Sequence, residues 1–494
     1  MKKLRITLAL LFFALITLLF LDFTGTLHQW LGWMAKIQLI PAILAHSVAI
    51  ILGLSLFTLL FGRVYCSTVC PLGVFQDGVS RLSRRRKKRR FRYAPPSTWL
   101  RYGMLAVFVV GVVAGVTIIM VLLDPFAAYG RMASNLLAPL YYWGNNLLAW
   151  FAERIDSYMF YTVDVWMKSA ITFGVAVATF VIIGVVAWMN GRFYCNTICP
   201  VGTFLGFISR FSLFKISFNK ERCTQCKLCE YQCKASCIDV ENTHIDHSRC
   251  VNCFNCIGSC KSDAIKYLPL KKSPPTVADD SDDSQGMSRR KTLSIMALLA
   301  VGGIIKAQQV QMDGGLATIE NQKIPNRKTP ITPPGAQGAA HLKRHCTACQ
   351  LCISACPNAV LRPSHKLATL MQPEVSYERG YCRPECTECS QVCPAGAIKR
   401  ITTAEKSAIS IGYAVWIGDN CVVNTDEVTC TCCERHCPTG AITLIERNPQ
   451  KTNSLKIPAI DKERCIGCGA CENLCPARPF SAIYVEGNVR HHQI

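Results

Sequence analysis

The sequence has little negative charge for its length. Among 494 residues there are 32 Asp and Glu against 54 Lys and Arg, which gives a formal net charge of +22. Such an excess can indicate nucleic-acid binding. Here, however, the densest basic run, "RLSRRRKKRRFR" from Arg81 to Arg92, lies between two apolar segments. Membrane topology therefore explains the charge more simply, and we expect no nucleic-acid partner.

Signatures of bond-making catalysis are also missing. The sequence shows no nucleophile–base pair, no phosphate-cradling glycine loop and no nucleotide fingerprint, so we assign no catalytic residue. Cysteine, in contrast, is abundant, with 30 residues. A disulfide scaffold is typical of small secreted chains, whereas these cysteines recur in metal-ligand spacings. The composition therefore favours metal binding and redox chemistry.

The stretch from Cys223 to Cys260 carries the spacing Cys-x2-Cys-x2-Cys-x3-Cys twice. Three closely spaced thiolates can bind three irons of one [4Fe–4S] cubane, and the fourth cysteine ligates the neighbouring cluster. Structural zinc is the alternative, but it closes with four ligands and explains a doubled run of eight less well. The predicted ligand sets are Cys223, Cys226, Cys229 and Cys260 for one cluster, and Cys250, Cys253, Cys256 and Cys233 for the other.

Four further groups near the C-terminus predict four more clusters, six in all. The groups are Cys346, Cys349, Cys352, Cys356; Cys382, Cys386, Cys389, Cys393; Cys421, Cys430, Cys433, Cys437; and Cys465, Cys468, Cys471, Cys475. We expect outer motifs to pair with outer and inner with inner, each fourth cysteine crossing over, so that Cys475 completes the first set. Cys237 and Cys432 are interpreted as non-ligands, although Cys432 adjoins Cys433 and either could serve.

Four nearly uncharged apolar segments predict transmembrane helices: Ile6–Leu21, Ile40–Leu60, Met104–Leu123 and Ala170–Met189. A cleaved signal peptide is the alternative for the first, but no convincing cleavage site follows it. The basic loop places itself and the N-terminus in the cytoplasm. Four crossings then put the first ferredoxin-like stretch in the cytoplasm as well.

The helical part contains an internal duplication. "GRVYCSTVCPLGVF" ends the second segment and "GRFYCNTICPVGTF" ends the fourth, which predicts two copies of a helical hairpin. Each copy presents two cysteines spaced i, i+4 on one helix face: Cys66 with Cys70, and Cys195 with Cys199. Three interpretations remain open: free or structural thiols, a thiol–disulfide relay, or convergence on a further metal centre or a quinone site. His46, inside the second segment, is either functional or a buried histidine bonded to a neighbouring helix.

The predicted organisation combines a membrane α-helical domain with two α+β ferredoxin-like iron–sulfur domains. A twin-arginine motif followed by a short apolar run predicts an export leader or a fifth membrane anchor, so the C-terminal domain is expected in the periplasm. The predicted domains are 1–205, transmembrane with paired CxxxCP motifs; 206–267, cytoplasmic two-cluster ferredoxin; 268–287, linker; 288–307, leader or anchor; 308–340, linker; and 341–494, four-cluster ferredoxin.

Residues 1–267, with their spans, paired "YCxTxCP" motifs and two-cluster ferredoxin, resemble the NapH/MauN-type membrane quinol dehydrogenase component. Residues 288–484, with "NCVVNTDEVTCTCCERHCP", resemble the NapG/MauM-type four-cluster ferredoxin, so the chain resembles a fusion of the two. The resemblance implies quinol oxidation at an inner-membrane domain and electron delivery to a periplasmic redox partner. Lys234 and Lys261 depart from the pattern, since proline usually follows the fourth cysteine.

We therefore predict an electron-transfer protein that carries electrons from quinol, or from a cytoplasmic ferredoxin-like donor, through six [4Fe–4S] clusters to a periplasmic reductase or cytochrome. Whether it counts as an enzyme depends on its acting as a quinol dehydrogenase. One alternative is an accessory protein that supplies electrons for maturation of a periplasmic metalloenzyme. Another is a redox sensor in which the Cys-x3-Cys pairs report the state of the quinone pool.

Overall fold

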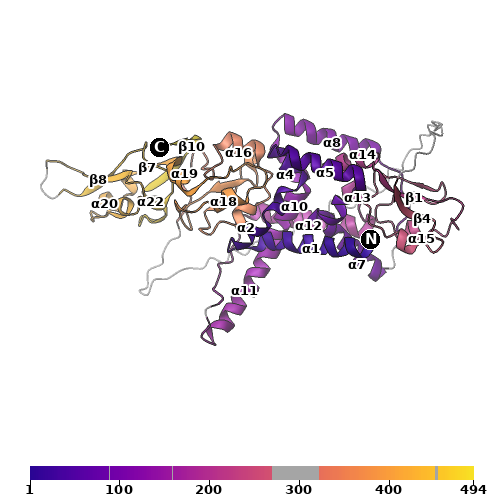
Figure 1. The fold of residues 1–494 in the computed structure, drawn as a ribbon. Helices are drawn as coiled ribbons and strands as arrows, with labels where there is room; N and C mark the ends of the chain where they lie inside the picture. The colour runs from indigo at the N-terminus through magenta and orange to yellow at the C-terminus, as the bar shows by residue number, and fades with distance from the viewer. Residues whose placement is uncertain (88–89, 158, 270–321, 451–453) are drawn as a thin grey trace, which may run out of the picture.

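A computed structural model describes the chain except for residues 88–89, 158, 270–321 and 451–453. A helical domain occupies the middle of the molecule, with one small β-containing domain at each end (Figure 1). The domain that carries strand β1 lies beside the N-terminus, and the C-terminal residues form the domain at the opposite end. The predicted leader or anchor, 288–307, lies outside the described residues, as do residues 270–287 and 308–321 of the two flanking linkers.

Two of the four predicted spans are single helices, α1 (Lys2–Leu21) and α12 (Ala170–Asn190), both long and apolar enough to cross a membrane. The second is broken into α4 (Leu39–Leu44) and α5 (Val48–Phe61), and the third into α8 (Thr98–Val113) and α9 (Thr117–Leu123). The first break contains His46 at φ 54° and the second Gly115 at φ 72°, left-handed conformations that stop an α-helix. The expectation of four unbroken spans is therefore not met.

Shorter helices build the rest of the helical domain. In each copy of the duplication, a one-turn helix carries the first cysteine and a second helix starts at the proline after the second cysteine, where proline suits the first turn. These helices are α6 (Tyr65–Thr68), α7 (Pro71–Lys87), α13 (Phe193–Thr197) and α14 (Pro200–Ser209). The others are α2 (Thr26–Leu31), α3 (Trp33–Lys36), α10 (Pro125–Met132), the π-helix η1 (Ala133–Leu137) and α11 (Ala138–Glu153), which projects from the body in Figure 1.

The first ferredoxin-like domain is held by two small antiparallel sheets. Its outer pair joins β1 (Phe214–Phe218) to β4 (Ile265–Pro269), and its inner pair joins β2 (Ile238–Asp239) to β3 (His244–Ile245). A short helix, α15 (Leu228–Tyr231), and a 3-10 turn, η2 (Ile257–Ser259), follow the cysteine loops. The two ends of the domain therefore meet in one sheet that encloses both cysteine motifs.

The C-terminal domain consists of two consecutive modules. The first contains α16 (Ala339–His345), α17 (Leu351–Ser354), η3 (Leu367–Thr369), α18 (Glu388–Val392) and the pair β5 (Leu361–Pro363) with β6 (Pro373–Val375). The second contains α19 (Thr403–Ala408), η4 (Gly418–Asn420), α20 (Val422–Thr425), α21 (Cys432–Arg435), α22 (Ala470–Asn473), and the pairs β7 (Ile409–Trp416) with β10 (Ile483–Gln493) and β8 (Ile442–Glu446) with β9 (Lys456–Ile460). Each module has its own hydrophobic core, and the core of the first continues into the helical domain.

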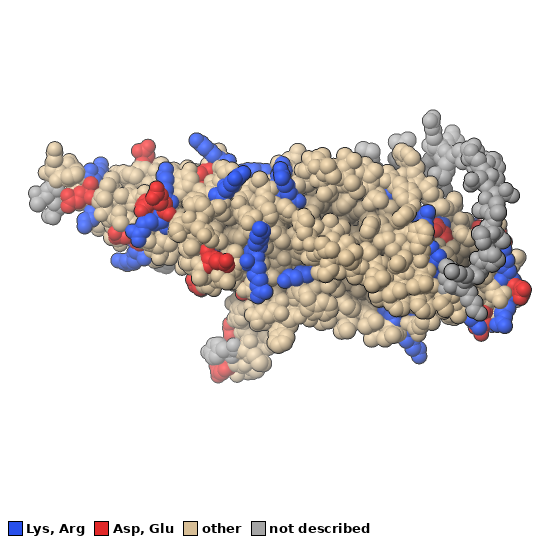
Figure 2. All heavy atoms as spheres, turned by 45° about the horizontal axis from the view of Figure 1, so that its top comes forward, with Lys and Arg blue, Asp and Glu red and all other residues tan. Residues whose placement is uncertain are grey.

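The surface separates into charged ends and an uncharged middle. Figure 2 shows a broad band over the helical domain with few Lys, Arg, Asp or Glu side chains. Large apolar residues are exposed there, including Leu52 at 64%, Val110 at 64% and Ile182 at 62% of their surface. A contiguous apolar surface of this extent marks a membrane or protein contact.

Candidate iron–sulfur sites and a central thiol site

The cysteine loops share an unusual backbone. In each motif with Cys-x2-Cys-x2-Cys spacing, the second and fourth residues after the first cysteine have positive φ. They are Gln225 and Lys227, Asn252 and Phe254, Ala348 and Gln350, and Gly467 and Gly469, with φ from 46° to 77°. Six of these eight are not glycine, so the conformation is strained by roughly 1–2 kcal/mol each. Strain repeated at the same places in four loops fits loops shaped to wrap a bound group.

Backbone N–H groups of these loops point at sulfur. Gln225 donates to Cys223 Sγ at 3.3 Å, and Ala348 donates to Cys346 Sγ at 3.4 Å. Ile398 and Ala482 donate in the same way, at 3.4 Å, to Cys393 and Cys475. Hydrogen bonds to sulfur are one of the means by which proteins set the potential of an iron–sulfur cluster.

The structure groups the eight thiols of the first domain as the sequence predicts. Cys229 lies in electrostatic range of Cys226 and Cys260. Cys256 lies in range of Cys253, Cys250 and Cys233. The fourth cysteine of each motif therefore crosses to the other set. All of these cysteines are free thiols, available as ligands.

The nested pairing predicted for the C-terminal domain is wrong. Cys352 lies in electrostatic range of Cys346, Cys349, Cys393 and Cys389, and Cys475 does not belong to that set. The observed sets are Cys346, Cys349, Cys352, Cys393; Cys382, Cys386, Cys389, Cys356; Cys421, Cys430, Cys433, Cys475; and Cys465, Cys468, Cys471, Cys437. Consecutive motifs exchange their fourth cysteine because each two-motif module closes shorter loops and packs its own core.

Cys432 and Cys433 differ in what their sulfurs contact. Cys432 Sγ donates a hydrogen bond to the Leu474 carbonyl at 3.0 Å, as a protonated thiol does. Burial, with the nearby Cys430 and Cys475, raises the pKa of Cys433 to about 12, so Cys433 would ionise only with a bound cation. The contacts favour Cys433 as the ligand, as the sequence interpretation had it.

Cys237 is buried against the second set, with its Sγ 3.5 Å from Cys233 Sγ. The Cys237 thiol lowers the pKa of Cys233 to about 7 through their hydrogen bond. Cys237 can therefore donate to a ligand sulfur without being a ligand, a contact that the sequence did not predict.

The two Cys-x3-Cys pairs converge in the helical domain. Cys70 lies in electrostatic range of Cys195 and Cys66, and Cys199 in range of all three other thiols. Each of the four residues is at most 5% exposed. Gln76 Nε2 contacts Cys195 Sγ at 3.3 Å. We call these four residues the central thiol site.

Two arginines cross between the repeats. Arg63 Nη2 donates to the Cys195 carbonyl at 3.2 Å, and Arg192 Nη1 donates to the Cys66 carbonyl at 2.6 Å, so each repeat holds the other. Gly73 and Gly202 make room for this exchange, because a Cβ at either would meet a cysteine carbonyl and lie 2.9 Å from the crossing guanidinium. The repeated "Gly-Arg" in the sequence was the only signal of this role.

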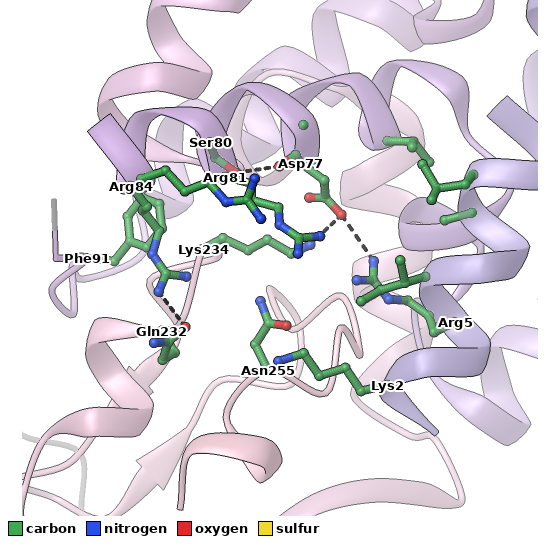
Figure 3. A pocket seen from close by; sticks show the side chains of 16 residues that line it. Lys2, Arg5, Asp77, Ser80, Arg81, Arg84, Phe91, Gln232, Lys234 and Asn255 are labelled. Atoms are coloured by element: carbon green, nitrogen blue, oxygen red, sulfur yellow. Dashed lines mark hydrogen bonds and ion pairs between the residues drawn. The ribbon is translucent and has the colours of Figure 1, made fainter. Parts of the chain in front are cut away.

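Asp77 ties the helical domain to the first ferredoxin-like domain. Its carboxylate accepts from Arg192 Nε at 2.6 Å. It also accepts from Arg5 Nη1 at 3.2 Å and pairs with Lys234 Nζ (Figure 3). Burial raises the pKa of Asp77, but Arg192 and Lys234 outweigh it and hold that pKa well below its usual range. The lysine that replaces the expected proline after Cys233 is therefore a structural anchor.

A cavity of about 490 Å³ opens beside this network. Figure 3 shows Lys2, Arg81 and Arg84 around it, with Asp77 and Arg5 at its inner wall. Next to Lys2 and Arg5, α1 adds an apolar part to the lining, formed by Ile6, Ala9 and Leu10. Arg84 and Lys234 lie in electrostatic range of Cys253. The cavity can therefore accept an amphipathic molecule with a polar head next to the second cysteine set.

His46 lies outside the central thiol site. Its ring faces His345 of the C-terminal domain with 6.1 Å between ring centres, at the break between α4 and α5. Both predicted roles of His46, as a functional residue or as a buried histidine bonded to a neighbouring helix, stay predictions.

These features define an iron–sulfur protein of the ferredoxin type, and comparisons with known proteins agree. The family model described as a 4Fe-4S binding domain matches residues 44–90 and 172–219, which contain the two CxxxCP motifs. A 4Fe-4S dicluster domain model matches residues 428–478. The chain belongs to the ferredoxin-type family that includes the methylamine utilization protein MauM.

The chain is 33% identical to MauM of Methylorubrum extorquens over 197 residues, 38% of this chain and 87% of the relative. It is 32% identical to the ferredoxin-type protein NapG of Haemophilus influenzae over 181 residues, 33% of this chain and 63% of NapG. An uncharacterized protein of Methanocaldococcus jannaschii is 34% identical over 96 residues, which are 19% of this chain and 37% of that relative. No solved structure matches the chain.

Proposed function

We propose that the protein is a membrane-bound conduit that takes electrons from quinol and delivers them through iron–sulfur clusters to a redox partner on the other side of the membrane. The observation that carries this proposal is the position of the helical domain, with its uncharged band, between two domains of cysteine sets. The family supports iron–sulfur electron transfer. The NapH/MauN-like identity of the helical domain, the count of six clusters and the partner belong to the proposal.

The membrane part would consist of α1, α12 and the two broken helix pairs. Exposed apolar side chains cover their outer faces, as a lipid contact requires. The last turns of α7, which carry Arg81, Arg84 and Arg85, lie at the same end as the N-terminus and the first ferredoxin-like domain, which supports a cytoplasmic position for this end. The C-terminal domain at the other end would then be periplasmic.

Bound [4Fe–4S] clusters accept and release one electron at a time. The protein's part is to hold them in series and exclude water. In the C-terminal domain, the second and fourth sets are adjacent, since the Cys382 N–H donates to the Cys468 carbonyl at 2.9 Å. Four thiol sets therefore form a continuous series along this domain, ending in the half-exposed Cys430 and Cys433 where a partner could dock.

Electrons would enter at the cytoplasmic end. The cavity beside Cys253 could hold a quinol head group while its tail follows the apolar side of α1. Oxidation of one quinol releases two protons and two electrons, which would leave singly. The exposed Cys226 marks a second entry for a soluble ferredoxin-like donor.

The test is anaerobic reduction of the purified protein with a quinol analogue, followed by EPR. Reduced-cluster signals would support quinol as the donor. If every cluster stays oxidised with quinol but is reduced by dithionite or a low-potential ferredoxin, quinol oxidation is refuted. A reporter fused at Ile494 that is active only in the cytoplasm would refute periplasmic delivery.

A further inference from the structure

Resting on this proposed function, we propose that Cys66, Cys70, Cys195 and Cys199 hold a seventh [4Fe–4S] cluster, which carries electrons between the two ferredoxin-like domains. The matched 4Fe-4S domain model covers this region without naming its ligands. The four thiols come from two repeats that are joined by hydrogen bonds from Arg63 and Arg192. The contact between the repeats therefore brings the thiols together.

Buried positive charge around the site points to a missing negative charge. Arg63 and Arg192, which donate to carbonyls of the central cysteines, are completely buried, and so is Arg131, which lies in range of Tyr194 beside them. Within the described residues, none of the three guanidinium nitrogens of Arg131 has a hydrogen-bond partner, nor does Arg63 Nε or Arg192 Nη2. Burial of a cation is costly unless an opposite charge lies near.

Carboxylates supply only part of that charge. The nearby carboxylates are Asp77, which is shared among three cations, and Asp124, which is within range of Arg131. A [4Fe–4S] core of charge 2+ bound by four thiolates carries a net charge of 2−, and its thiolates need no proton. One bound cluster would therefore supply the negative charge that the buried arginines lack.

The spacing favours a cluster over a single ion. Among the residues that the structure describes, no three or more His, Cys, Asp or Glu side chains are arranged to hold one metal ion. The six cysteine sets of the ferredoxin-like domains, as far as they are described, also lack this arrangement for a single ion, although their sequence spacing is that of cubane ligands. The four central thiols lie in electrostatic range of one another, as the thiols of those sets do, which favours the same kind of centre.

On one side, the central thiol site adjoins the first ferredoxin-like domain through the backbone next to a predicted ligand, Cys233. The Arg192 N–H donates to the Lys234 carbonyl at 2.9 Å, and Asn196 Nδ2 donates to the Ala235 carbonyl at 3.4 Å. Asn196 follows Cys195 and Lys234 follows Cys233 in the chain. Few covalent bonds and one hydrogen bond thus separate the two thiol sets.

On the other side, the site adjoins the first C-terminal module. Tyr194 lies in electrostatic range of Cys199 and Cys195 as well as of Asp124. Arg131 lies in range of both Tyr194 and Cys349. Gly130 packs so closely on the Cys349 carbonyl that a Cβ there would approach it to 2.6 Å. The central site is therefore the step between the two domains.

The proposed transfer is a one-electron exchange. As the cluster held by Cys233, Cys250, Cys253 and Cys256 is reoxidised from 1+ to 2+, the central cluster is reduced from 2+ to 1+, and the same exchange follows with the set that contains Cys349. No bond is made or broken, and no proton is needed. The electron comes from quinol or from the soluble donor of the proposed function.

The experiment measures iron, sulfide and zinc in the anaerobically purified full chain. Seven clusters predict about 28 iron atoms per chain, and six predict about 24. The double variant Cys66→Ser with Cys195→Ser should lose about four irons and keep about 24, which would also show that the ferredoxin domains remain folded. Cys432→Ser is the matched control and should lose none.

A second measurement follows electrons across the protein in lipid nanodiscs. When a soluble low-potential ferredoxin donates at the cytoplasmic end, EPR should show reduced clusters of the C-terminal domain in the wild type and in Cys432→Ser, but not in the double variant. About 24 irons in the wild type, or zinc at the central site, would overturn the seventh cluster. About 28 irons with no reduction by quinol would instead overturn the quinol proposal and leave the central cluster intact.

Discussion

Arg63 and Arg192 join the two repeats by reciprocal hydrogen bonds, and adding one methyl group beside them tests this contact. Gly73 and Gly78 lie in the same helix, α7, yet their surroundings differ. A Cβ added at Gly73 would collide with the Cys66 carbonyl and lie 2.9 Å from Arg192 Nη1, whereas a Cβ at Gly78 would meet nothing within 4 Å. Gly73→Ala should therefore destabilise the helical domain, and Gly78→Ala serves as its matched control.

The magnitude follows from two opposing effects. Replacing glycine by alanine inside a helix stabilises it by about 0.5–1 kcal/mol, and both variants share this gain. Overpacking a filled interior costs about 1–3 kcal/mol, and only Gly73→Ala incurs that cost. For a domain of this size, 1 kcal/mol shifts Tm by roughly 2–4 °C, so the two variants should differ by about 3–10 °C.

The assay is thermal unfolding of the purified protein in detergent, with iron content measured in parallel. Gly202→Ala against Gly184→Ala repeats the comparison in the second copy, because Gly202 faces the Cys195 carbonyl and Gly184 has open space. If Gly73→Ala and Gly202→Ala are as stable as their controls, the reciprocal packing of arginine and carbonyl is not what holds the repeats together.

Three further outcomes are expected. Cys433→Ser should lose about four irons and Cys432→Ser none; equal losses would contradict the assignment of Cys433. Cys393→Ala should alter the same EPR centre as Cys352→Ala, whereas an effect on a different centre would restore the nested pairing. Burial, with the charge of His492, lowers the pKa of His491 from 6.5 to about 4. Below about pH 6.5 unfolding therefore takes up a proton. The free energy of unfolding should fall between pH 6.5 and 4, by up to about 3 kcal/mol. His491→Gln should flatten this loss, followed as retention of cluster absorbance; an unchanged profile would contradict it.

The cysteine motifs could be recognised from sequence because their spacing is set by the geometry of the cluster rather than by the fold. The exchange of the fourth cysteine between paired motifs followed from the same chemistry. Which motifs pair could not be predicted, since adjacent and nested pairing place the same residue types at the same spacings. Cys393 rather than Cys475 completes the set of Cys352 because each two-motif module packs its own core.

Hydropathy found the apolar segments but not their interruptions. An average over about 20 residues does not detect one left-handed residue, and a single histidine in an apolar segment does not by itself predict that conformation. The break at Gly115 had a clearer signal, since glycine adopts positive φ without strain. At both places the break replaces one long helix by two shorter helices, so neither segment crosses the domain as a single helix.

The candidate site residues that are hardest to recognise from sequence are the buried arginines. Arginine in an apolar domain is normally interpreted as a loop or interface residue, because its burial is costly. Arg63, Arg131 and Arg192 are nevertheless completely buried, and Arg63 and Arg192 donate to backbone carbonyls of the central cysteines. Six thiol sets in the ferredoxin-like domains were found from ligand spacing, but the central site combines two pairs that are 129 positions apart. Its evidence is therefore geometric: the four thiols lie in range of one another, and buried arginines from both repeats contact them, an arrangement that an anionic cluster fits.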